Sequence, residues 1–315
     1  MYAMALATDF DGTLAEHGVV DDLTLLALRR LRDSGCKLIL VTGRELPDLK
    51  RVFAHTKLFD RIVAENGALL YTPATEEERA IAPAPPPEFA ETLRQKGVER
   101  ISIGRSIVAT WEPHQTIVLE TIKEMGLELE IIFNKSAVMV LPSGVNKASG
   151  LEVALEELSL SPLNVVGVGD AENDHALLRV CGFGAAVANA LPALKETADV
   201  VLKEERGAGV TELIARICAG EAPLPMNERH AIVIGEDAEG AIATYPNDVL
   251  LIAGSSGIGK STLVTALTER MNERHVQFCI FDPEGDYEGL EGAVTVGDTT
   301  TPPVKEQVPQ LLSEP

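Results

Sequence analysis

The sequence predicts an α/β protein with a buried parallel sheet, a small α+β insert and a further α/β segment at the C-terminus. Three observations lead to this prediction. Short apolar runs alternate with amphipathic helical stretches from the N-terminus onward, a rhythm typical of βαβ units. After Tyr71 the rhythm changes to two successive helix–hairpin units. Finally, the stretch AGEAPLPMN at 219–227 separates a last strand–helix pattern from the rest.

The first part of the chain is expected to form the parallel sheet. Runs of four to seven apolar residues separated by helices indicate strands that are buried on both faces. A strand is predicted for Tyr2–Thr8, and leucines at helical spacing predict a helix over Asp21–Asp33. The pattern continues with a strand at Lys37–Val41 and a helix at Leu46–Ala54. It resumes later with helices at Lys147–Leu158, Asn173–Val180 and Gly209–Cys218, and strands at Leu163–Val168, Phe183–Val187 and Asp199–Leu202.

The insert is predicted to be a small αββαββ unit with an antiparallel sheet. It follows TPATEEERAIAPAPPPEF (72–89), which is rich in proline and glutamate and is expected to be an exposed linker. Turns are expected at Gly104-Arg105 and Asn134-Lys135. The predicted helices are Glu88–Lys96 and Pro113–Met125, and the predicted strands are Arg100–Ile103, Ser106–Trp111, Glu128–Phe133 and Ala137–Leu141.

Beyond the linker at 219–227, the sequence predicts short strands and one long helix. The expected helix runs from Lys260 to about Asn272. The expected strands are Ala231–Ile234, Ala241–Thr244, Val249–Ala253 and Val276–Phe281.

The composition is that of an acidic globular protein. The 315 residues include 48 acidic and 27 basic ones, which gives a net charge of −21 and no basic face for nucleic acid. There is no apolar run of 18 residues, and the N-terminus MYAMALATDFDG has no basic region, so neither a membrane span nor a secretory signal is expected. The four cysteines show no metal spacing and are predicted to be buried thiols in a reducing compartment, the cytoplasm.

Polar side chains follow three predicted strands. DFDGTL places Asp9 and Asp11 after the first strand, and VTGR places Thr42 after the second. GVGDAEND places Asp170 and Asp174 after a later strand. Because ligands of open α/β sheets bind at the carboxyl ends of strands, these side chains are expected to form one site. Hard oxygen ligands without histidine or thiolate suit Mg²⁺, and clustered carboxylates need a cation before they can accept an anionic substrate.

This set of residues predicts phosphoryl-transfer chemistry. A carboxylate beside Mg²⁺ can attack phosphorus and form an aspartyl-phosphate. A second carboxylate can protonate the leaving group and later activate water. Thr42 can donate a hydrogen bond to a phosphoryl oxygen, and Lys147, at the start of a predicted helix, can neutralise one.

Four motifs in this order resemble the haloacid dehalogenase (HAD) superfamily of phosphotransferases over roughly residues 3–218: DFDGT, the threonine of VTGR, Lys147 and GDAEND. ENGA at Glu65–Ala68 and the position of the insert resemble the type IIB branch, which has a C2-type cap. The short cap is similar to that of small phosphatases of the archaeal phosphoglycolate phosphatase and sucrose-phosphatase-like kind. The resemblance therefore implies a Rossmann-like core and a phosphatase acting on a small phosphorylated metabolite.

The resemblance also implies individual roles. Asp9 would be the nucleophile and Asp11 the general acid/base. Mg²⁺ would be held by Asp9, the backbone carbonyl of Asp11 and Asp170, with Asp174 in support. Phosphate-binding residues would be Thr42, Gly43, Lys147 and Asn173, and substrate contacts would be Arg44 and Asn66.

A second motif, GSSGIGKS at Gly254–Ser261, fits the GxxxxGK[ST] pattern of a P-loop. Its glycines allow backbone N–H groups to surround phosphate, Lys260 can reach terminal phosphates, and Ser261 can ligate Mg²⁺. FCIFDPEGDY further along is similar to a segment of HerA/VirB4-type ATPases, a resemblance that spans about residues 230–292. The predicted nucleotide-binding residues are Gly254, Gly257, Gly259, Lys260, Ser261 and Thr262.

Only 54 residues follow Ser261, fewer than a complete P-loop domain needs, and the tail TTTPPVKEQVPQLLSEP is expected to be poorly structured. The chain is therefore interpreted as a fragment of a longer HAD–ATPase fusion. Two interpretations of the loop stay open: ATP binding, with hydrolysis only in the complete protein or with a partner subunit, or a degenerate loop that binds weakly. The predicted boundaries are 1–72 and 143–218 for the core, 73–142 for the cap, 219–227 for the linker and 228–315 for a partial P-loop segment.

Three functional hypotheses follow. The first is a Mg²⁺-dependent phosphatase that hydrolyses a small phosphate monoester through an aspartyl-phosphate, with an appended ATP-binding segment. The second is a P-loop ATPase or switch whose HAD part is regulatory. The third is a HAD phosphotransferase or phosphomutase. Retention of both Asp9 and Asp11 favours catalysis over a regulatory role.

Overall fold

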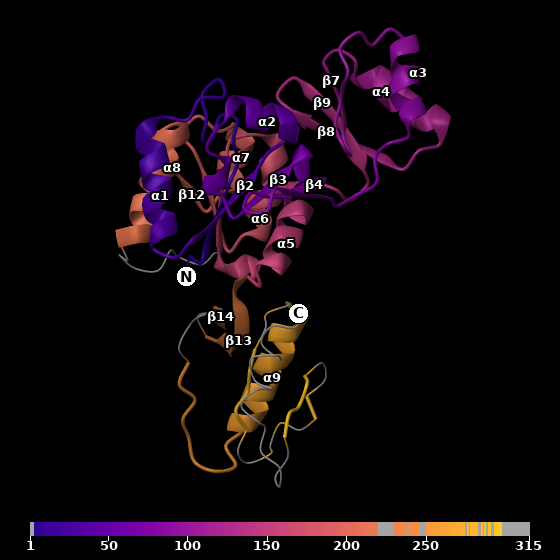
Figure 1. Ribbon diagram of the computed structural model, residues 1–315. Coiled ribbons are helices and arrows are strands. Elements are labelled where there is room, and N and C mark those ends of the chain that lie inside the picture. Colours follow the sequence, from indigo (N-terminus) through magenta and orange to yellow (C-terminus); the bar gives the residue numbers. More distant parts are fainter. Residues whose placement is uncertain are drawn as a thin grey trace. The chain divides into compact units, whose positions relative to one another are not determined.

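A computed structural model describes residues 3–219, 230–238, 240–245 and 250–274, and, further on, 276, 278–282, 285, 287, 289–290 and 293–297. The chain divides into two compact units, Met1–Pro225 and Met226–Pro315 (Figure 1). Except for Ala219, the predicted linker at 219–227 lies outside the described residues, as does the predicted tail at 299–315.

The first unit is built on an eight-stranded sheet with the order β12-β11-β10-β1-β2-β3-β4-β5. The strands from β12 to β3 run parallel, and β4 and β5 extend the sheet antiparallel. The predicted α/β class is therefore confirmed. The strands are β1 (Ala5–Thr8), β2 (Lys37–Val41), β3 (Arg61–Ala64), β4 (Leu69–Thr72), β5 (Glu77–Ala80), β10 (Val165–Gly169), β11 (Phe183–Ala186) and β12 (Val200–Val201).

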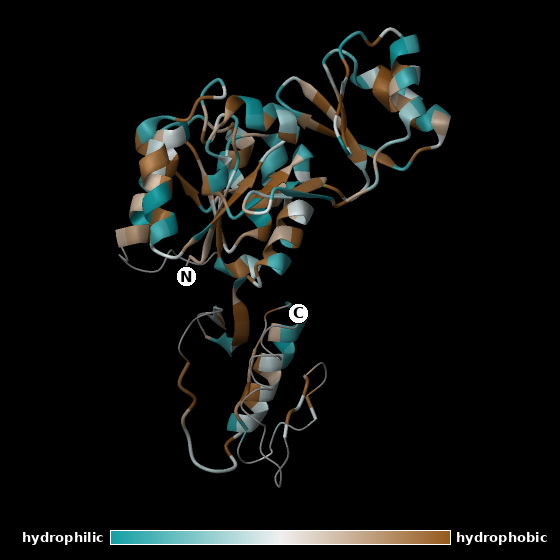
Figure 2. Ribbon diagram, viewed as in Figure 1, coloured by the Kyte–Doolittle hydropathy of each residue, from teal (hydrophilic) through white to brown (hydrophobic). Residues whose placement is uncertain are grey.

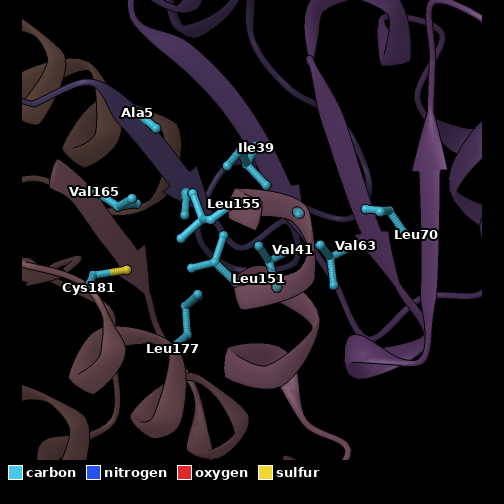
Figure 3. Close-up of a cluster of buried hydrophobic side chains, with 12 residues drawn as sticks. Ala5, Ile39, Val41, Val63, Leu70, Leu151, Leu155, Val165, Leu177 and Cys181 are labelled. Atoms are coloured by element: carbon cyan, nitrogen blue, oxygen red, sulfur yellow. The ribbon is translucent and has the colours of Figure 1, made fainter. Parts of the chain in front are cut away.

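Helices cover both faces of this sheet. The helices of the core are α1 (Asp22–Asp33), α2 (Leu46–Val52), α5 (Lys147–Glu157), α6 (His175–Val180), α7 (Pro192–Thr197) and α8 (Arg206–Ala219). On one face, the alternate strand residues Ile39 and Val41 pack with Leu151 of α5 and Leu177 of α6 (Figure 3). The intervening residues, such as Leu38, point to the opposite face, and α1 and α8 pack against each other there. In Figure 2 the strands are mostly hydrophobic and the helices carry both colours, as expected for amphipathic helices around a buried sheet.

The insert forms a separate small layer, which we call the cap and define as α3 to β9. Its four-stranded antiparallel sheet has the order β6-β7-β9-β8, with α3 and α4 on it (Figure 1). Phe89, Leu93, Val118 and Val140 are at the centre of its hydrophobic cluster. The elements are α3 (Pro87–Gln95), β6 (Ser102–Ile103), β7 (Val108–Trp111), α4 (Gln115–Met125), β8 (Leu129–Asn134) and β9 (Ala137–Pro142), in the predicted αββαββ order.

Strands β3, β4 and β5 and helix α7 of the first unit were not among the predicted elements. Residues 72–89, predicted to be a linker throughout, contain β5, an exposed edge strand that pairs with β4. The strand has no apolar alternation because all four of its residues are exposed, so its sequence resembles a loop. The short helix α7 was not predicted either. It begins at Pro192, a residue that favours the first turn of a helix.

In the second unit, the described residues form a β13–β14 hairpin and one helix. The elements are β13 (Ile232–Asp237), β14 (Gly240–Thr244) and α9 (Lys260–Glu273). The predictions of strands at Val249–Ala253 and Val276–Phe281 are wrong for the described residues, which are irregular there. A strand requires a paired neighbour, and no described residue of this unit pairs with either run. Apolar composition alone therefore did not produce strands.

The cysteines and the helix lengths give two further findings. Cys36 and Cys181 are buried as predicted, but the expectation of burial is wrong for Cys218 and Cys279, which are exposed. Cys218 lies in the last turn of α8, beyond the buried residues of that helix, the last of which is Ile214. Within the described part of the chain, no helix has the length and apolar character required to span a membrane.

Candidate active site

The site is formed where β1, β2 and β10 end side by side. Asp9 follows β1, Thr42 follows β2 and Asp170 follows β10, and all three are nearly or fully buried. Because these strands are parallel neighbours, their carboxyl ends meet at one edge. The Asp9 N–H donates to Val168 O at 3.0 Å, so the loop after β1 continues to follow β10.

Lys147 is the first residue of α5 and lies at the centre of the site. Its helix begins with a capping box in which Asn146 Oδ1 accepts from the N–H groups of Ala148 and Ser149. The ammonium is 2.6 Å from Asp9 Oδ1 and 2.6 Å from Asp174 Oδ1, and only 1% of the side chain is exposed. A helix start thus holds a buried cation between two buried carboxylates.

Burial and charge shift the acid–base properties of this cluster. Burial raises the pKa of Asp9 to about 8, with Asp174 and Asp170 adding to the effect and Lys147 opposing it. Burial alone would lower the pKa of Lys147, but the Asp174 and Asp9 carboxylates raise it above its ordinary value. The lysine is therefore charged at neutral pH, and a further cation beside Asp9 would favour the carboxylate form that burial disfavours.

Three carboxylates can supply that cation's ligands. Asp9, Asp170 and Asp174 each offer an oxygen, and these oxygens lie within 4.8 Å of one another. Asp174 Oδ2 also accepts from the N–H groups of Asp170 and Ala171, at 2.9 and 3.0 Å, and so fixes the loop after β10. An all-oxygen, anionic donor set of this kind fits Mg²⁺.

Gly12 allows the close approach of the loops after β1 and β10. Its φ of 89° is in the left-handed region, and a Cβ there would lie 2.3 Å from Asp170 Oδ2. Thr13, next in sequence, donates from Oγ1 to Asp170 Oδ1 at 3.2 Å. The DFDGT sequence therefore provides both carboxylates and the space for the third.

Asp11 is held by Arg44 rather than by the buried cluster. Arg44 Nε and Nη2 donate to the two Asp11 oxygens at 2.6 and 2.7 Å, and its Nη1 binds Asp48. These hydrogen bonds, which Asp11 accepts, raise the pKa of Arg44. About a third of the Asp11 side chain is exposed, in contrast to Asp9. Arg44, predicted as a substrate contact, thus lies where it orients Asp11.

The predicted phosphate-binding residues lie next to each other. Asn173 Nδ2 donates to Asn66 Oδ1 at 2.8 Å, and Asn173 Nδ2 lies 3.6 Å from where a Cβ of Gly43 would be. Thr42 is fully buried and its Oγ1 accepts from the Arg44 N–H at 3.1 Å. Asn66 Nδ2 and Asn173 Oδ1 are buried without a hydrogen-bond partner, which suits a site that binds a polar ligand.

Two residues of the site were not predicted. Lys135, in the turn between β8 and β9 of the cap, donates to Asp170 Oδ2 at 3.0 Å. Glu65 is fully buried after β3 and accepts from the cap N–H groups of Arg105 and Ser106 at 2.8 and 2.7 Å. Burial raises the pKa of Glu65. Lys135 was in a predicted turn and Glu65 in the ENGA motif, so both residues lay in segments that the sequence singled out. The contacts of Lys135 with Asp170 and of Glu65 with the cap backbone could not be predicted from the sequence.

The P-loop motif lies in the second unit at the start of α9. Gly257 and Gly259 have φ angles of 78° and 97°, which glycine adopts without strain. Lys260 Nζ lies 3.0 Å from the carbonyl oxygens of Gly254 and Ser255, so the loop curves around its own lysine. Ser261 and Thr262 occupy the first turn of the helix.

Comparison with known proteins agrees with the fold. A family model for haloacid dehalogenase-like hydrolases matches residues 6–113 and 112–214. The phosphoglycolate phosphatase of Methanothermobacter thermautotrophicus is 30% identical over 218 residues, which cover 67% of this chain and 97% of that protein. Phosphoglycolate phosphatase 2 of Saccharolobus solfataricus is 31% identical over 224 residues, with 68% and 92% covered.

Structural comparison agrees with the sequence matches. A solved HAD/COF-like hydrolase from Plasmodium vivax has a TM-score of 0.60 at 20% identity, covering 69% of this chain and 96% of that one. A second family model, for the central domain of the helicase HerA, matches residues 247–310.

The chain belongs to the haloacid dehalogenase-like hydrolases, the class that its fold and acidic strand-end site define. Within this family it is a phosphatase.

Proposed function

We propose that this protein hydrolyses a small phosphate monoester in a Mg²⁺-dependent reaction that passes through an aspartyl-phosphate on Asp9. The observation that supports this best is the buried contact of Asp9 with Lys147, next to two further carboxylates. Lys147 binds Oδ1 of Asp9, which leaves Oδ2 to act as the nucleophile. The lysine charge also offsets the negative charge of an incoming phosphoryl group.

The two half-reactions are assigned to two carboxyl groups. Asp9 attacks phosphorus, a phosphorus–oxygen bond forms to its carboxylate, and the ester oxygen leaves with a proton from Asp11. Asp11 then takes a proton from water, which attacks the aspartyl-phosphate and releases inorganic phosphate and free Asp9. Arg44 orients Asp11 for both proton transfers through two hydrogen bonds.

Asp9, Asp170 and Asp174 are the side chains that would hold Mg²⁺, with the backbone carbonyl of Asp11 as a further ligand. When bound, the ion would stabilise negative charge on the transferring phosphoryl group. Thr42, Gly43 and Asn173 are proposed to bind the phosphoryl oxygens. We expect phosphate release to stop when the metal is chelated with EDTA and to return when Mg²⁺ is added in excess.

The relatives suggest which small monoester to test first. Two of them are named phosphoglycolate phosphatases and match nearly their whole length. We therefore propose a small phosphorylated metabolite as substrate, and phosphoglycolate is the first compound to assay. A phosphotransferase, which would pass the phosphoryl group to an acceptor other than water, differs only in what enters the site after Asp9 is phosphorylated. Measuring free phosphate against transfer to added alcohols separates the two.

For the second unit we propose a nucleotide-binding segment. The domain boundaries that we propose are 228–315 for this segment, 219–227 for the linker, 73–142 for the cap, and 1–72 with 143–218 for the core. The support is the GSSGIGKS loop before α9 and the match to the HerA central domain. ATP is the ligand proposed for this loop. The alternative that the phosphatase part only regulates an ATPase would require both Asp9 and Asp11 to be dispensable.

Replacing Lys260 with alanine tests this segment. The ammonium should bind the terminal phosphates of ATP, so its loss should weaken ATP binding by about 10-fold or more. Isothermal titration calorimetry of the full chain with ATP, wild type against Lys260→Ala, gives the comparison. Lys123→Met, an exposed lysine in the last turn of α4, is the control. Equal ATP affinity in wild type and Lys260→Ala would mean that the nucleotide does not bind at this loop.

A further inference from the structure

Lys135 extends from the cap into the acidic cluster of the core. It lies in the two-residue turn of the β8–β9 hairpin, fixed by the pairing of Asn134 with Ala137. Its backbone N–H donates to Glu172 Oε2 at 3.1 Å, and its Nζ is 3.0 Å from Asp170 Oδ2. The turn is therefore attached to the core through the backbone of Lys135, and the ammonium of the same residue makes a second contact, with Asp170 in the site.

The same hairpin covers the phosphate-binding loop. A Cβ on Gly43 would lie 3.4 Å from Met139 Sδ and 3.8 Å from Asn134 Nδ2, both of the cap. Gly12 is close as well, since a Cβ there would lie 2.9 Å from Lys135 Nζ. A phosphate ester bound at Asp9 would thus have its non-reacting end next to the Lys135 turn.

Lys135 differs from the other cations that contact the acidic residues of the site. In the described part of the chain, three basic side chains form ion pairs with Asp9, Asp11 or Asp170. Lys147 has two carboxylate partners and is 1% exposed, and Arg44 has two acidic partners. Lys135 has a single ion pair and a side chain that is 52% exposed. Its own ammonium is half exposed, so it can turn toward a ligand at little desolvation cost once a cation such as Mg²⁺ pairs with the buried Asp170.

The partner of Lys135 is also a proposed ligand of Mg²⁺. A divalent cation held by Asp170 would repel the ammonium and compete for the same carboxylate. The half-exposed Lys135 side chain would then be available to bind another anion, while its backbone hydrogen bond to Glu172 keeps the turn in place. The protein has a net charge of −21, which disfavours the binding of anions. A substrate with a second negative group besides its phosphate would therefore bind better where a positive side chain such as Lys135 contacts that group.

We propose that Lys135 is a specificity-determining residue that binds a second anionic group, a carboxylate, on the substrate. The inference rests on the proposed function and narrows it to phosphorylated acids. The phosphoryl end is bound by the core residues around Asp9, and the carboxylate end by the cap. Discrimination against uncharged esters of the same size follows, because such esters leave the ammonium without its ligand.

The experiment compares 2-phosphoglycolate with 2-hydroxyethyl phosphate, which has an alcohol in place of the carboxylate. The quantity measured is the ratio of kcat/KM for the acid to kcat/KM for the alcohol. We expect this ratio to fall by about 10-fold or more in Lys135→Met, the size of a lost charged hydrogen bond. Lys135→Arg, which keeps the charge, and Lys123→Met, a surface control on α4, should keep the ratio within about 3-fold of wild type.

Two results would overturn the inference while leaving the phosphatase intact. One is an unchanged ratio in Lys135→Met, and the other is an equal loss on both esters, which would place the ammonium on the shared phosphoryl group. Failure of the proposed function looks different, because neither ester would then give phosphate release that depends on Asp9. In that event, calorimetric binding of the two esters still tests Lys135, and equal affinities in wild type and Lys135→Met would reject it.

Discussion

Asp9→Asn is expected to reduce phosphate release to below about 1% of wild type while the protein stays folded. The amide has nearly the same shape as the carboxylate and keeps an oxygen for the Lys147 ammonium, which lies 2.6 Å from Asp9 Oδ1. It is too weak a nucleophile to form the aspartyl-phosphate. The measurement is steady-state phosphate release on a small monoester, with circular dichroism to compare the folded state.

Asp33→Asn is the matched control for this variant. Asp33 ends α1 and its side chain is 72% exposed, so the same chemical change there should leave kcat/KM near the wild-type value. Residual turnover of Asp9→Asn well above about 1%, with Mg²⁺ present, would mean that another group attacks phosphorus.

Lys147→Met is expected to have the second largest effect, on stability and activity together. Removal of the buried ammonium leaves Asp9 and Asp174 without their shared partner, and breaking such a buried pair costs about 3–5 kcal/mol. The midpoint of thermal unfolding should therefore fall by several degrees. Phosphate release should be lost as well, because the Lys147 ammonium no longer offsets the negative charge of the phosphoryl group.

Lys57→Met separates this effect from the loss of any lysine. Lys57 forms an ion pair with Glu76 in which both side chains are more than half exposed. Such exposed pairs contribute about 0–1 kcal/mol, so the unfolding midpoint should hardly change. A Lys147→Met protein as stable as Lys57→Met would show that the buried cluster is not held together by this charge.

Much of the core could be predicted because its signals are local. Helix α1 begins where Asp21 can cap it, α5 begins at the predicted Lys147, and the apolar runs became β1 and β2. The strand-end positions of the acidic residues then followed from the parallel topology alone. For the same reason, the order of the cap elements could be predicted from alternating helices and hairpins.

What could not be predicted depends on partners distant in sequence. Lys135 and Asp170 are 35 residues apart, and Glu65 reaches backbone groups 40 and 41 residues further on. These contacts exist only once cap and core are in place. Strand β5 was missed because its pairing with β4, not its composition, makes it a strand. Residues 250–253 show the opposite error, since this apolar run has no strand neighbour among the described residues and stayed irregular.

The central claim is that the site around Asp9, rather than the P-loop, performs the phosphatase reaction. The most direct test is Mg²⁺-dependent phosphate release from a panel of phosphorylated metabolites and ATP, comparing wild type with Asp9→Asn and Lys260→Ala. The account predicts release from a small ester that is lost in Asp9→Asn and retained in Lys260→Ala. Release from ATP alone, lost in Lys260→Ala and retained in Asp9→Asn, would contradict it and make the haloacid dehalogenase-like part an accessory.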